Sequence, residues 1–191
     1  MIKNRCGHHK GNSTEQLLDK KFIINKLDII PGQIIIDVGC GNGHMAREFS
    51  LLTGNMGKVY ALDMEPEVIE KLKNKIKAAN IIPIITDITK KTGIKDHSID
   101  LIYLSAIFHI FSDEQKKSFL KEIKRLLKPN GKLVIIEIEK KETLFGPPCN
   151  MRVSPEEMVQ IIKMKLLSLS KVGDYFYMQV FENVDCSYFS M

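Results

Sequence analysis

The sequence has few cysteines and no long apolar run. Its four cysteines, among 191 residues, are widely separated and form no C-x-x-C pair. This spacing excludes a disulfide framework and favours reduced thiols. No apolar run approaches the ~20 residues that a membrane-spanning helix needs. The first ten residues, MIKNRCGHHK, lack an apolar stretch after their basic residues. No secretory signal is therefore predicted, and we expect a cytoplasmic protein.

The sequence also lacks a compact block of basic residues, although its formal net charge is +5. Several lysines, such as Lys71, Lys73, Lys75 and Lys77, lie among apolar residues at helical spacing. This pattern is typical of the solvated face of a helix. Because no Lys/Arg cluster with interleaved aromatic residues is present, we expect no nucleic-acid partner.

Three possible metal ligands, Cys6, His8 and His9, lie together near the start of the sequence. A structural zinc site needs four ligands, and no fourth lies nearby. We therefore predict no metal. The polar residues 1–13 are expected to form a flexible arm, or a lid over a bound acceptor.

Apolar runs typical of buried strands alternate with amphipathic helical segments. The expected strands are residues 33–38, 58–63, 81–86, 98–105, 132–139, 166–172 and 175–181. The expected helices start at Ser13 (a capping box with Gln16), Gly43, Pro66, Asp113 and Ser154, the fourth ending at KPNG. The alternation predicts an α/β fold: a doubly wound, Rossmann-like, mostly parallel seven-stranded sheet with an antiparallel C-terminal hairpin. Pro83 should place the third strand at a sheet edge.

We expect a single domain spanning 1–191. After the arm, its cofactor-binding core would cover residues 14–138, and a C-terminal helix and hairpin would cover 139–191. At this length a chain can bury a sizeable core without disulfides or metals.

The stretch IIIDVGCGNGHMA, residues 34–46, joins the first expected parallel strand to a helix. Its glycines lie at 39, 41 and 43, so it reads G-x-G-x-G. A dinucleotide fingerprint requires G-x-G-x-x-G, and His44 occupies the position of the last glycine. This departure disfavours an NAD-dependent dehydrogenase. No lysine follows the glycines to neutralise a phosphate.

An aspartate ends or follows each of the first three parallel strands: Asp37, Asp63 and Asp87. Asp63 lies 20 residues after Gly43, where a carboxylate can accept both ribose hydroxyls. Asp87 could reach an adenine edge, and Asp37 adds negative charge beside the glycine loop. Together they indicate a site for an adenosine that carries a cationic group.

These features resemble the class I S-adenosylmethionine (SAM) dependent methyltransferases, nearest to the small-molecule branch that includes the ubiquinone and menaquinone methyltransferases. The stretches that carry the resemblance are IIIDVGCGNGHMA, VYALDM, TDIT, SIDLIYLSAIFH and LLKPNGKLVIIE. The resemblance implies SAM as the cofactor. It implies that the methionine part is held by Asp37 and by the loop of Gly39, Cys40, Gly41 and Gly43. It implies that Asp63 binds the ribose and that the adenine is contacted by Met64, Asp87 and Ile88. Ser105 would approach the methionine end and the acceptor.

Methyl transfer from SAM needs a base only if the acceptor must lose a proton. His109 is the best candidate base. The alternative is a histidine that anchors its loop by packing against Phe108 or Phe111. Glu137 and Tyr175, with Tyr177, are candidates for binding the acceptor. Cys40 has no base near it, which favours a small spacer over a nucleophile.

The predicted function is therefore SAM-dependent methyl transfer to a small-molecule acceptor by in-line displacement. Enzymes that methylate amino groups of nucleic acids carry [Asn/Asp]-Pro-Pro-[Tyr/Phe] after the fourth strand, where this sequence reads Ser105-Ala106-Ile107-Phe108. The alternative function is a non-catalytic SAM-binding partner or sensor. The acceptor atom and the oligomeric state are left open.

Overall fold

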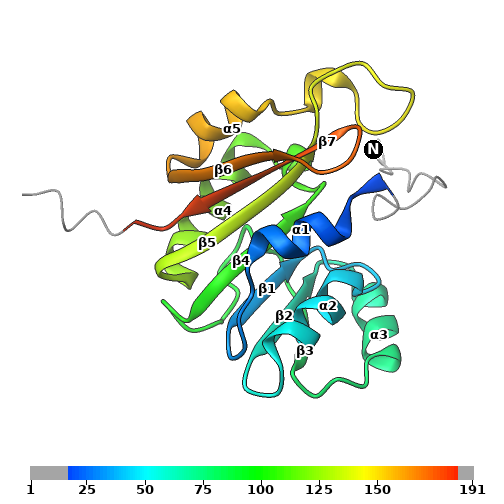
Figure 1. Ribbon diagram of the computed structural model, residues 1–191, viewed down its shortest axis with the longest axis vertical. Coiled ribbons are helices and arrows are strands. Elements are labelled where there is room, and N and C mark those ends of the chain that lie inside the picture. Colours follow the sequence, from blue (N-terminus) through cyan, green and yellow to red (C-terminus); the bar gives the residue numbers. More distant parts are fainter. Residues whose placement is uncertain (1–16, 185–191) are drawn as a thin grey trace, which may run out of the picture.

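The computed structural model describes residues 17–184, which form one seven-stranded sheet with helices on both faces (Figure 1). The strands are β1 (Ile34–Val38), β2 (Lys58–Asp63), β3 (Ile81–Ile85), β4 (Ile99–Ser105), β5 (Leu127–Ile138), β6 (Lys165–Lys171) and β7 (Phe176–Glu182). The helices are α1 (Lys20–Leu27), α2 (His44–Thr53), α3 (Pro66–Lys75), α4 (Asp113–Leu126) and α5 (Pro155–Ile162), with 3-10 turns η2 (Phe108–Ile110) and η3 (Cys149–Met151).

The strand order is β3-β2-β1-β4-β5-β7-β6. Strands β1 to β5 pair in parallel, and β7 pairs antiparallel with both β5 and β6. The predicted fold class is confirmed. Pro83 lies in β3 at the sheet edge, as predicted, because a residue without an N–H costs no ladder hydrogen bond there.

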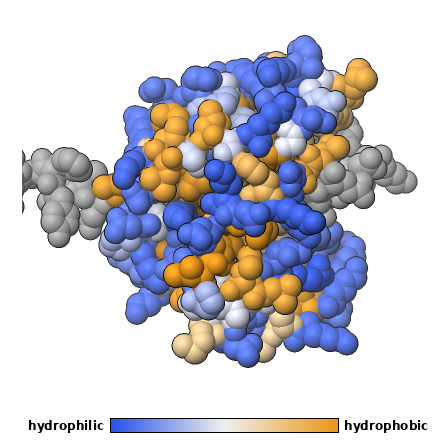
Figure 2. All heavy atoms as spheres, viewed as in Figure 1, coloured by the Kyte–Doolittle hydropathy of each residue, from blue (hydrophilic) through white to orange (hydrophobic). Residues whose placement is uncertain are grey.

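Two apolar cores lie on the two faces of the sheet. One contains Ile23 of α1, Phe49 of α2 and Ile69 of α3. The other contains Phe119 of α4 and Met158 of α5. Successive side chains of a strand point to opposite faces, so the central strands contribute to both cores. The edge strand β6 instead exposes leucines, and apolar side chains gather over it in Figure 2.

The start of α4 differs by one residue from the sequence-based expectation. The N-cap of α4 is Ser112, in a capping box with Gln115, and not Asp113, which is the first helical residue. The Ser13 start predicted for the first helix lies outside the described residues; the helix that is described begins at Lys20, with Asp19 as its N-cap.

The KPNG segment does not simply follow the end of α4 but lies within β5 as the structure bounds it. The helix ends at Leu126, and the register of β5 against β4 shifts between the Ile99 and Leu101 pairings. Asn130 has a left-handed φ of 62° in this segment. A bulge of this kind lets Pro and Asn occupy a strand without a regular ladder.

The carboxyl ends of the parallel strands meet along one edge of the sheet. Strand order reverses between β1 and β4, which are neighbours although β2 follows β1 in the chain. Ligands of open α/β sheets bind in the crevice outside such a switch point. The first residues of β7 also reach this edge, because β7 runs antiparallel to β5.

Candidate active site

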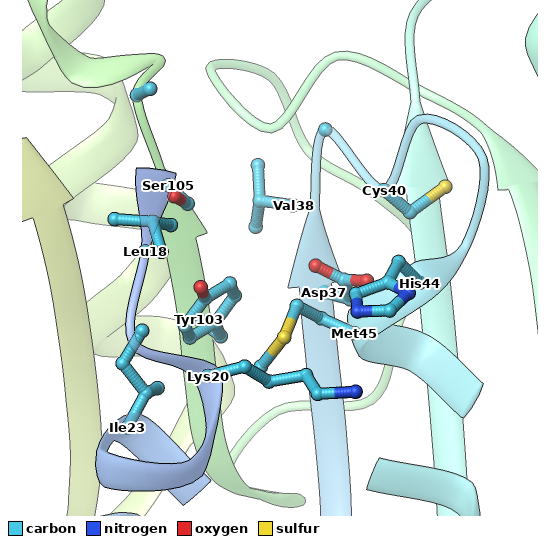
Figure 3. Close-up of a pocket in the computed structure, with 12 residues that line it drawn as sticks. Leu18, Lys20, Ile23, Asp37, Val38, Cys40, His44, Met45, Tyr103 and Ser105 are labelled. Carbon is cyan, nitrogen blue, oxygen red and sulfur yellow. The ribbon is translucent and has the colours of Figure 1, made fainter. Parts of the chain in front are cut away.

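A cavity of about 230 Å³ opens at the carboxyl ends of β1 and β4 (Figure 3). Its walls come from three regions: the start of α1, the glycine loop with the start of α2, and the end of β4. The lining residues are Leu18, Lys20, Ile23, Asp37, Val38, Gly39, Cys40, His44, Met45, Tyr103, Ser105 and Ala106. The cavity thus lies at the predicted cofactor site.

The glycine loop is held tightly against the neighbouring strands. The Cys40 amide donates to the Leu62 carbonyl at 2.9 Å, and the Gly43 amide donates to the Cys40 carbonyl at 2.8 Å. Gly39 has a left-handed φ of +64°, and a Cβ there would lie 2.0 Å from Cδ1 of Ile107. Only glycine fits this position without strain, so the close packing of the loop against Ile107 depends on Gly39.

Asp37 occupies the wall of the cavity near its base. It belongs to β1, its exposed fraction is 3%, and it lines the cavity between the glycine loop and β4. A carboxylate in so dry a place favours a cationic ligand group beside it. Ser105 and Ala106 line the opposite side. Ala106 has a left-handed φ of 54°, which turns the chain sharply after β4.

Cys40 is buried at 5% exposure, and its sulfur points away from Val38 and Ser105 in Figure 3. Burial raises the pKa of its thiol far above the usual value, and the charges of Asp37 and Asp63 raise it further. The side chain is therefore a protonated thiol at neutral pH, which is the opposite of what a nucleophile needs.

Asp63 joins the end of β2 to the glycine loop. Its carboxylate accepts hydrogen bonds from the Gly41 amide at 3.2 Å and from the Glu65 amide at 3.0 Å. Met64 follows it on the surface. Neither residue lines the cavity, but both lie at the same sheet edge. Their predicted contacts with ribose and adenine stay predictions.

Asp87 lies just after β3, the outermost parallel strand. Its Oδ1 accepts from the Thr89 amide at 2.9 Å and from the Thr89 hydroxyl at 2.6 Å. Its Oδ2 lies 3.7 Å from the Lys90 ammonium. Ile88 is buried in the core on the α4 side. The structure thus gives Asp87 a turn-forming role, and its predicted contact with adenine remains untested.

His109 and Glu137 form a buried pair. Nδ1 of His109 lies 2.8 Å from Oε2 of Glu137, and the His109 amide donates to Oε1 at 3.3 Å. The Glu137 side chain is 0% exposed and the His109 side chain 10%. When Glu137 is ionised it can only accept, so Nδ1 is the donor in this contact and Nε2 is not engaged by Glu137. Neither residue lines the cavity of Figure 3.

Two tyrosines mark the start of β7. Tyr177 pairs with Glu137 across the β5–β7 ladder, and its hydroxyl donates to the Val153 carbonyl at 2.7 Å. Burial raises the pKa of Tyr177, and the charge of Glu137 adds to this. Tyr175 is more exposed, and its ring meets that of Phe145 edge to face at 4.9 Å between centroids.

Phe145 belongs to the loop that follows β5, and buried Arg152 holds this loop. All five N–H donors of a guanidinium can be used at once when acceptors surround it. Here the acceptors are the carbonyls of Glu139, Lys141, Phe145 and Pro147 and the hydroxyl of Thr143, at 2.5 to 3.1 Å. These hydrogen bonds fix the conformation of residues 139–147 beside the start of β7.

Several cavity residues were not predicted from the sequence. Lys20 and Ile23 come from α1, Leu18 comes from the segment just before it, and His44 and Met45 come from the first turn of α2. The α2 residues directly follow the glycines, and this adjacency was a usable signal. Nothing in the α1 sequence indicates that this helix crosses the cofactor site, because its position depends on tertiary packing.

The chemistry of the cavity fits SAM. Asp37 would supply a negative charge for the cationic methionine part, and Gly39 brings backbone without a side chain to the cavity wall. The glycine loop has no lysine after it for a phosphate. In residues 17–184 no group of three His, Cys, Asp or Glu side chains is arranged to hold a metal ion. Cys6, His8 and His9 lie outside this range.

Comparison with known families defines the class of protein. The family described as "Methyltransferase domain" matches residues 36–135, just over half of the chain, and this segment contains the glycine loop, β4 and most of β5. The chain belongs to this family. The predictions of a SAM-dependent methyltransferase class and of SAM as cofactor are confirmed.

Two curated relatives show sequence identities below 30% to this chain. The "Ubiquinone/menaquinone biosynthesis C-methyltransferase UbiE" of Laribacter hongkongensis is 28% identical over 129 residues, covering 67% of this chain and 52% of the relative. The Escherichia fergusonii protein of the same name is 26% identical over 124 residues, covering 63% and 49%. The chain thus spans about half the length of the curated relatives it matches.

Solved structures extend the likeness over most of the chain. A SAM-dependent methyltransferase from Aquifex aeolicus superposes with a TM-score of 0.81 at 28% identity, covering 91% of this chain and 94% of that one. A methyltransferase from Mesorhizobium loti gives a TM-score of 0.70 at 13% identity, covering 85% and 96%, and shares the fold. Within residues 17–184, no helix is long and apolar enough to cross a membrane.

Proposed function

We propose that this chain transfers the methyl group of SAM to a carbon atom of a small, apolar, ring-containing acceptor. One observation carries the proposal: a single short segment connects the cofactor cavity to a buried acid–base pair. Ser105 and Ala106 line the cavity, and four residues after Ser105 the chain reaches His109, bonded to Glu137. A base held beside a methyl donor suits an acceptor that must lose a proton.

SAM, when bound, supplies a sulfonium methyl group that is attacked in line, so that the carbon–sulfur electron pair returns to sulfur as a neutral thioether. The chain's own task is alignment and exclusion of water. In the proposal, Asp37 and the backbone at Gly39 hold the methionine part. Asp63 binds the ribose, and Met64, Asp87 and Ile88 border the adenine. Ser105 lies between the cofactor and the acceptor.

His109 is proposed as the base. A carbon acceptor forms its new bond to the methyl group and then releases the proton that the carbon carried. Nε2 of His109 takes this proton, since Nδ1 is already committed to Glu137. Glu137 is fully buried, so we assign it a positioning role through His109 instead of direct contact with the acceptor. A buried carboxylate also stabilises the imidazolium that forms.

The acceptor side is proposed to be the surface beside Tyr175 and Phe145. Their edge-to-face contact leaves both rings partly exposed at the sheet edge where β5 ends and β7 begins. Aromatic rings favour further aromatic contacts in offset or edge-to-face geometry. The names of the relatives, C-methyltransferases of ubiquinone and menaquinone biosynthesis, agree with a ring-containing acceptor.

The test is methyl transfer from radiolabelled SAM to a panel of hydroquinones and phenols with alkyl substituents, set against a panel of polar amines. We expect turnover on the first panel only. Phe145→Ala should raise KM for these acceptors severalfold, whereas Leu144→Ala, which removes the fully exposed neighbouring side chain, should not. Preferred methylation of the amines would refute the proposed acceptor class.

His109→Ala should lower kcat by about 10²- to 10⁴-fold, the range of general-base catalysis. Added imidazole should restore part of this loss, because it can take the proton in the vacated space. The affinity for S-adenosylhomocysteine (SAH), the demethylated product, should not change. Binding of SAH without transfer to any acceptor would instead favour the alternative of a non-catalytic SAM-binding protein.

A further inference from the structure

The cofactor cavity carries charges of both signs on different walls. Asp37 comes from β1, and Lys20 comes from the start of α1. Figure 3 shows the Lys20 side chain extending from the start of α1 across the cavity, beneath Met45. Among the described residues that line the cavity, Lys20 is the only lysine or arginine.

The ammonium of Lys20 forms an ion pair with Glu48 of α2. Nζ lies 2.8 Å from Oε1 of Glu48, and the two side chains are 38% and 31% exposed. A lysine ammonium has three donors, and this bond uses one of them. Lys20 can therefore bind a second acceptor inside the cavity and keep its contact with Glu48.

The position of Lys20 is fixed by segments that are remote in the sequence. Asp19 caps α1, accepting from the Phe22 amide at 3.0 Å, and the Asp19 amide donates to the carbonyl of Val172 at 3.3 Å. Gly173, in the turn between β6 and β7, lies so close that a Cβ there would be 2.3 Å from the Leu17 carbonyl oxygen. The C-terminal hairpin thus docks the start of α1 over the cavity.

The methionine part of SAM presents an ammonium and a carboxylate at its end, beside the sulfonium. Asp37 is suited to the cationic groups, and the carboxylate needs a donor of the opposite sign. The amide of His44, at the start of α2, already donates to Oδ1 of Asn42 at 2.9 Å. We propose that Lys20 binds the carboxylate of the SAM methionine part, with Glu48 positioning its ammonium. This inference rests on the cofactor assignment and is independent of the proposed acceptor.

The test compares two ligands by calorimetry: SAH, which has the amino-acid end, and 5′-methylthioadenosine, which lacks it. Lys20→Met removes the charge and keeps most of the stem. It should weaken SAH binding by about 10- to 100-fold, the scale of a hydrogen bond to a charged group. It should change 5′-methylthioadenosine binding by less than twofold. Lys20→Arg should keep most of the SAH affinity.

Lys21→Met is the matched control, since Lys21 is the exposed neighbour on the same helix. It should leave both affinities unchanged. Equal weakening of both ligands by Lys20→Met would mean that the residue only shapes the cavity, and no weakening of SAH would assign the carboxylate to the start of α2; either result overturns the proposal. If the wild-type protein does not bind SAH, the cofactor assignment is overturned as well. If it binds SAH but methylates none of the acceptors, the proposed role of Lys20 is unaffected.

Discussion

Replacing Gly39 by alanine tests whether the glycine loop is fixed by close packing against the segment after β4. Gly39 has a φ of +64°, a left-handed conformation that costs an L-residue about 1–2 kcal/mol. The new Cβ would also lie 2.0 Å from Cδ1 and 3.3 Å from Cγ1 of Ile107. Overpacking of this kind costs roughly 1–3 kcal/mol. We expect Gly39→Ala to lower the free energy of unfolding by about 2–5 kcal/mol.

The two contributions can be separated by a double-mutant cycle with Ile107→Ala. This second change removes the atoms that the new Cβ would meet. In the Ile107→Ala background, Gly39→Ala should cost only the backbone term, about 1–2 kcal/mol. Urea unfolding followed by circular dichroism measures all four proteins, and SAH calorimetry shows whether the loop still binds cofactor.

Gly93 provides a matched control. Its φ is +77°, but a Cβ there would meet nothing within 4 Å. Gly93→Ala should therefore cost about 1–2 kcal/mol in both backgrounds. If Gly39→Ala costs the same with and without the Ile107 side chain, to within about 0.5 kcal/mol, the packing argument is refuted.

Three further predictions concern other contacts. Asp63→Ala should weaken SAH binding by about 2 kcal/mol in calorimetry, because a charged hydrogen-bond acceptor is lost. Gly173→Ala should lower the free energy of unfolding by about 2 kcal/mol in urea, since its Cβ would lie 2.3 Å from the Leu17 carbonyl oxygen. Glu122→Gln should cost about 3 kcal/mol at pH 7, because it breaks a largely buried ion pair with Arg125. Although burial opposes ionisation, Arg125 holds the pKa of Glu122 below its usual 4.5. This stabilisation is complete above pH 4.5 and is lost as the pH falls through the lowered pKa, so the difference between wild type and variant should narrow on acidification.

Each of these three predictions would be contradicted by a different result. Unchanged SAH affinity in a folded Asp63→Ala protein would mean that the ribose assignment is wrong. A Gly173→Ala protein as stable as wild type would show that the hairpin turn does not press on the chain before α1. A Glu122→Gln deficit that stays constant between pH 7 and pH 3.5 would mean that ionisation of Glu122 contributes nothing to stability.

Much of the fold could be predicted from the sequence because its signals are local. Apolar runs of strand length alternate with helical patterns, and this alone requires a mostly parallel sheet with crossovers. The edge position of β3 followed from Pro83, and the start of α3 from Pro66. The start of β5 was not predicted correctly, because the pairing of β5 with β4 drew the KPNG segment into the sheet.

The cofactor class was also readable from the sequence. The glycine spacing, His44 at the position of the last fingerprint glycine and the aspartates at strand ends are features of single positions. They need no knowledge of distant neighbours. The same holds for Cys40, whose place between two glycines indicated a spacer, in agreement with its buried, protonated thiol.

Which residues lie in contact could not be predicted from local sequence patterns. Lys20 and Glu48, and likewise His109 and Glu137, are each separated by 28 residues in the sequence and meet at 2.8 Å. Such pairs depend on strand order and on where α1 docks, which are set by burial of both faces of the sheet. Local patterns in the sequence were thus enough to predict the fold class and the cofactor. The packing of α1 against the C-terminal hairpin, and of η2 against β5, determined which charged residues line the cavity and how His109 is held.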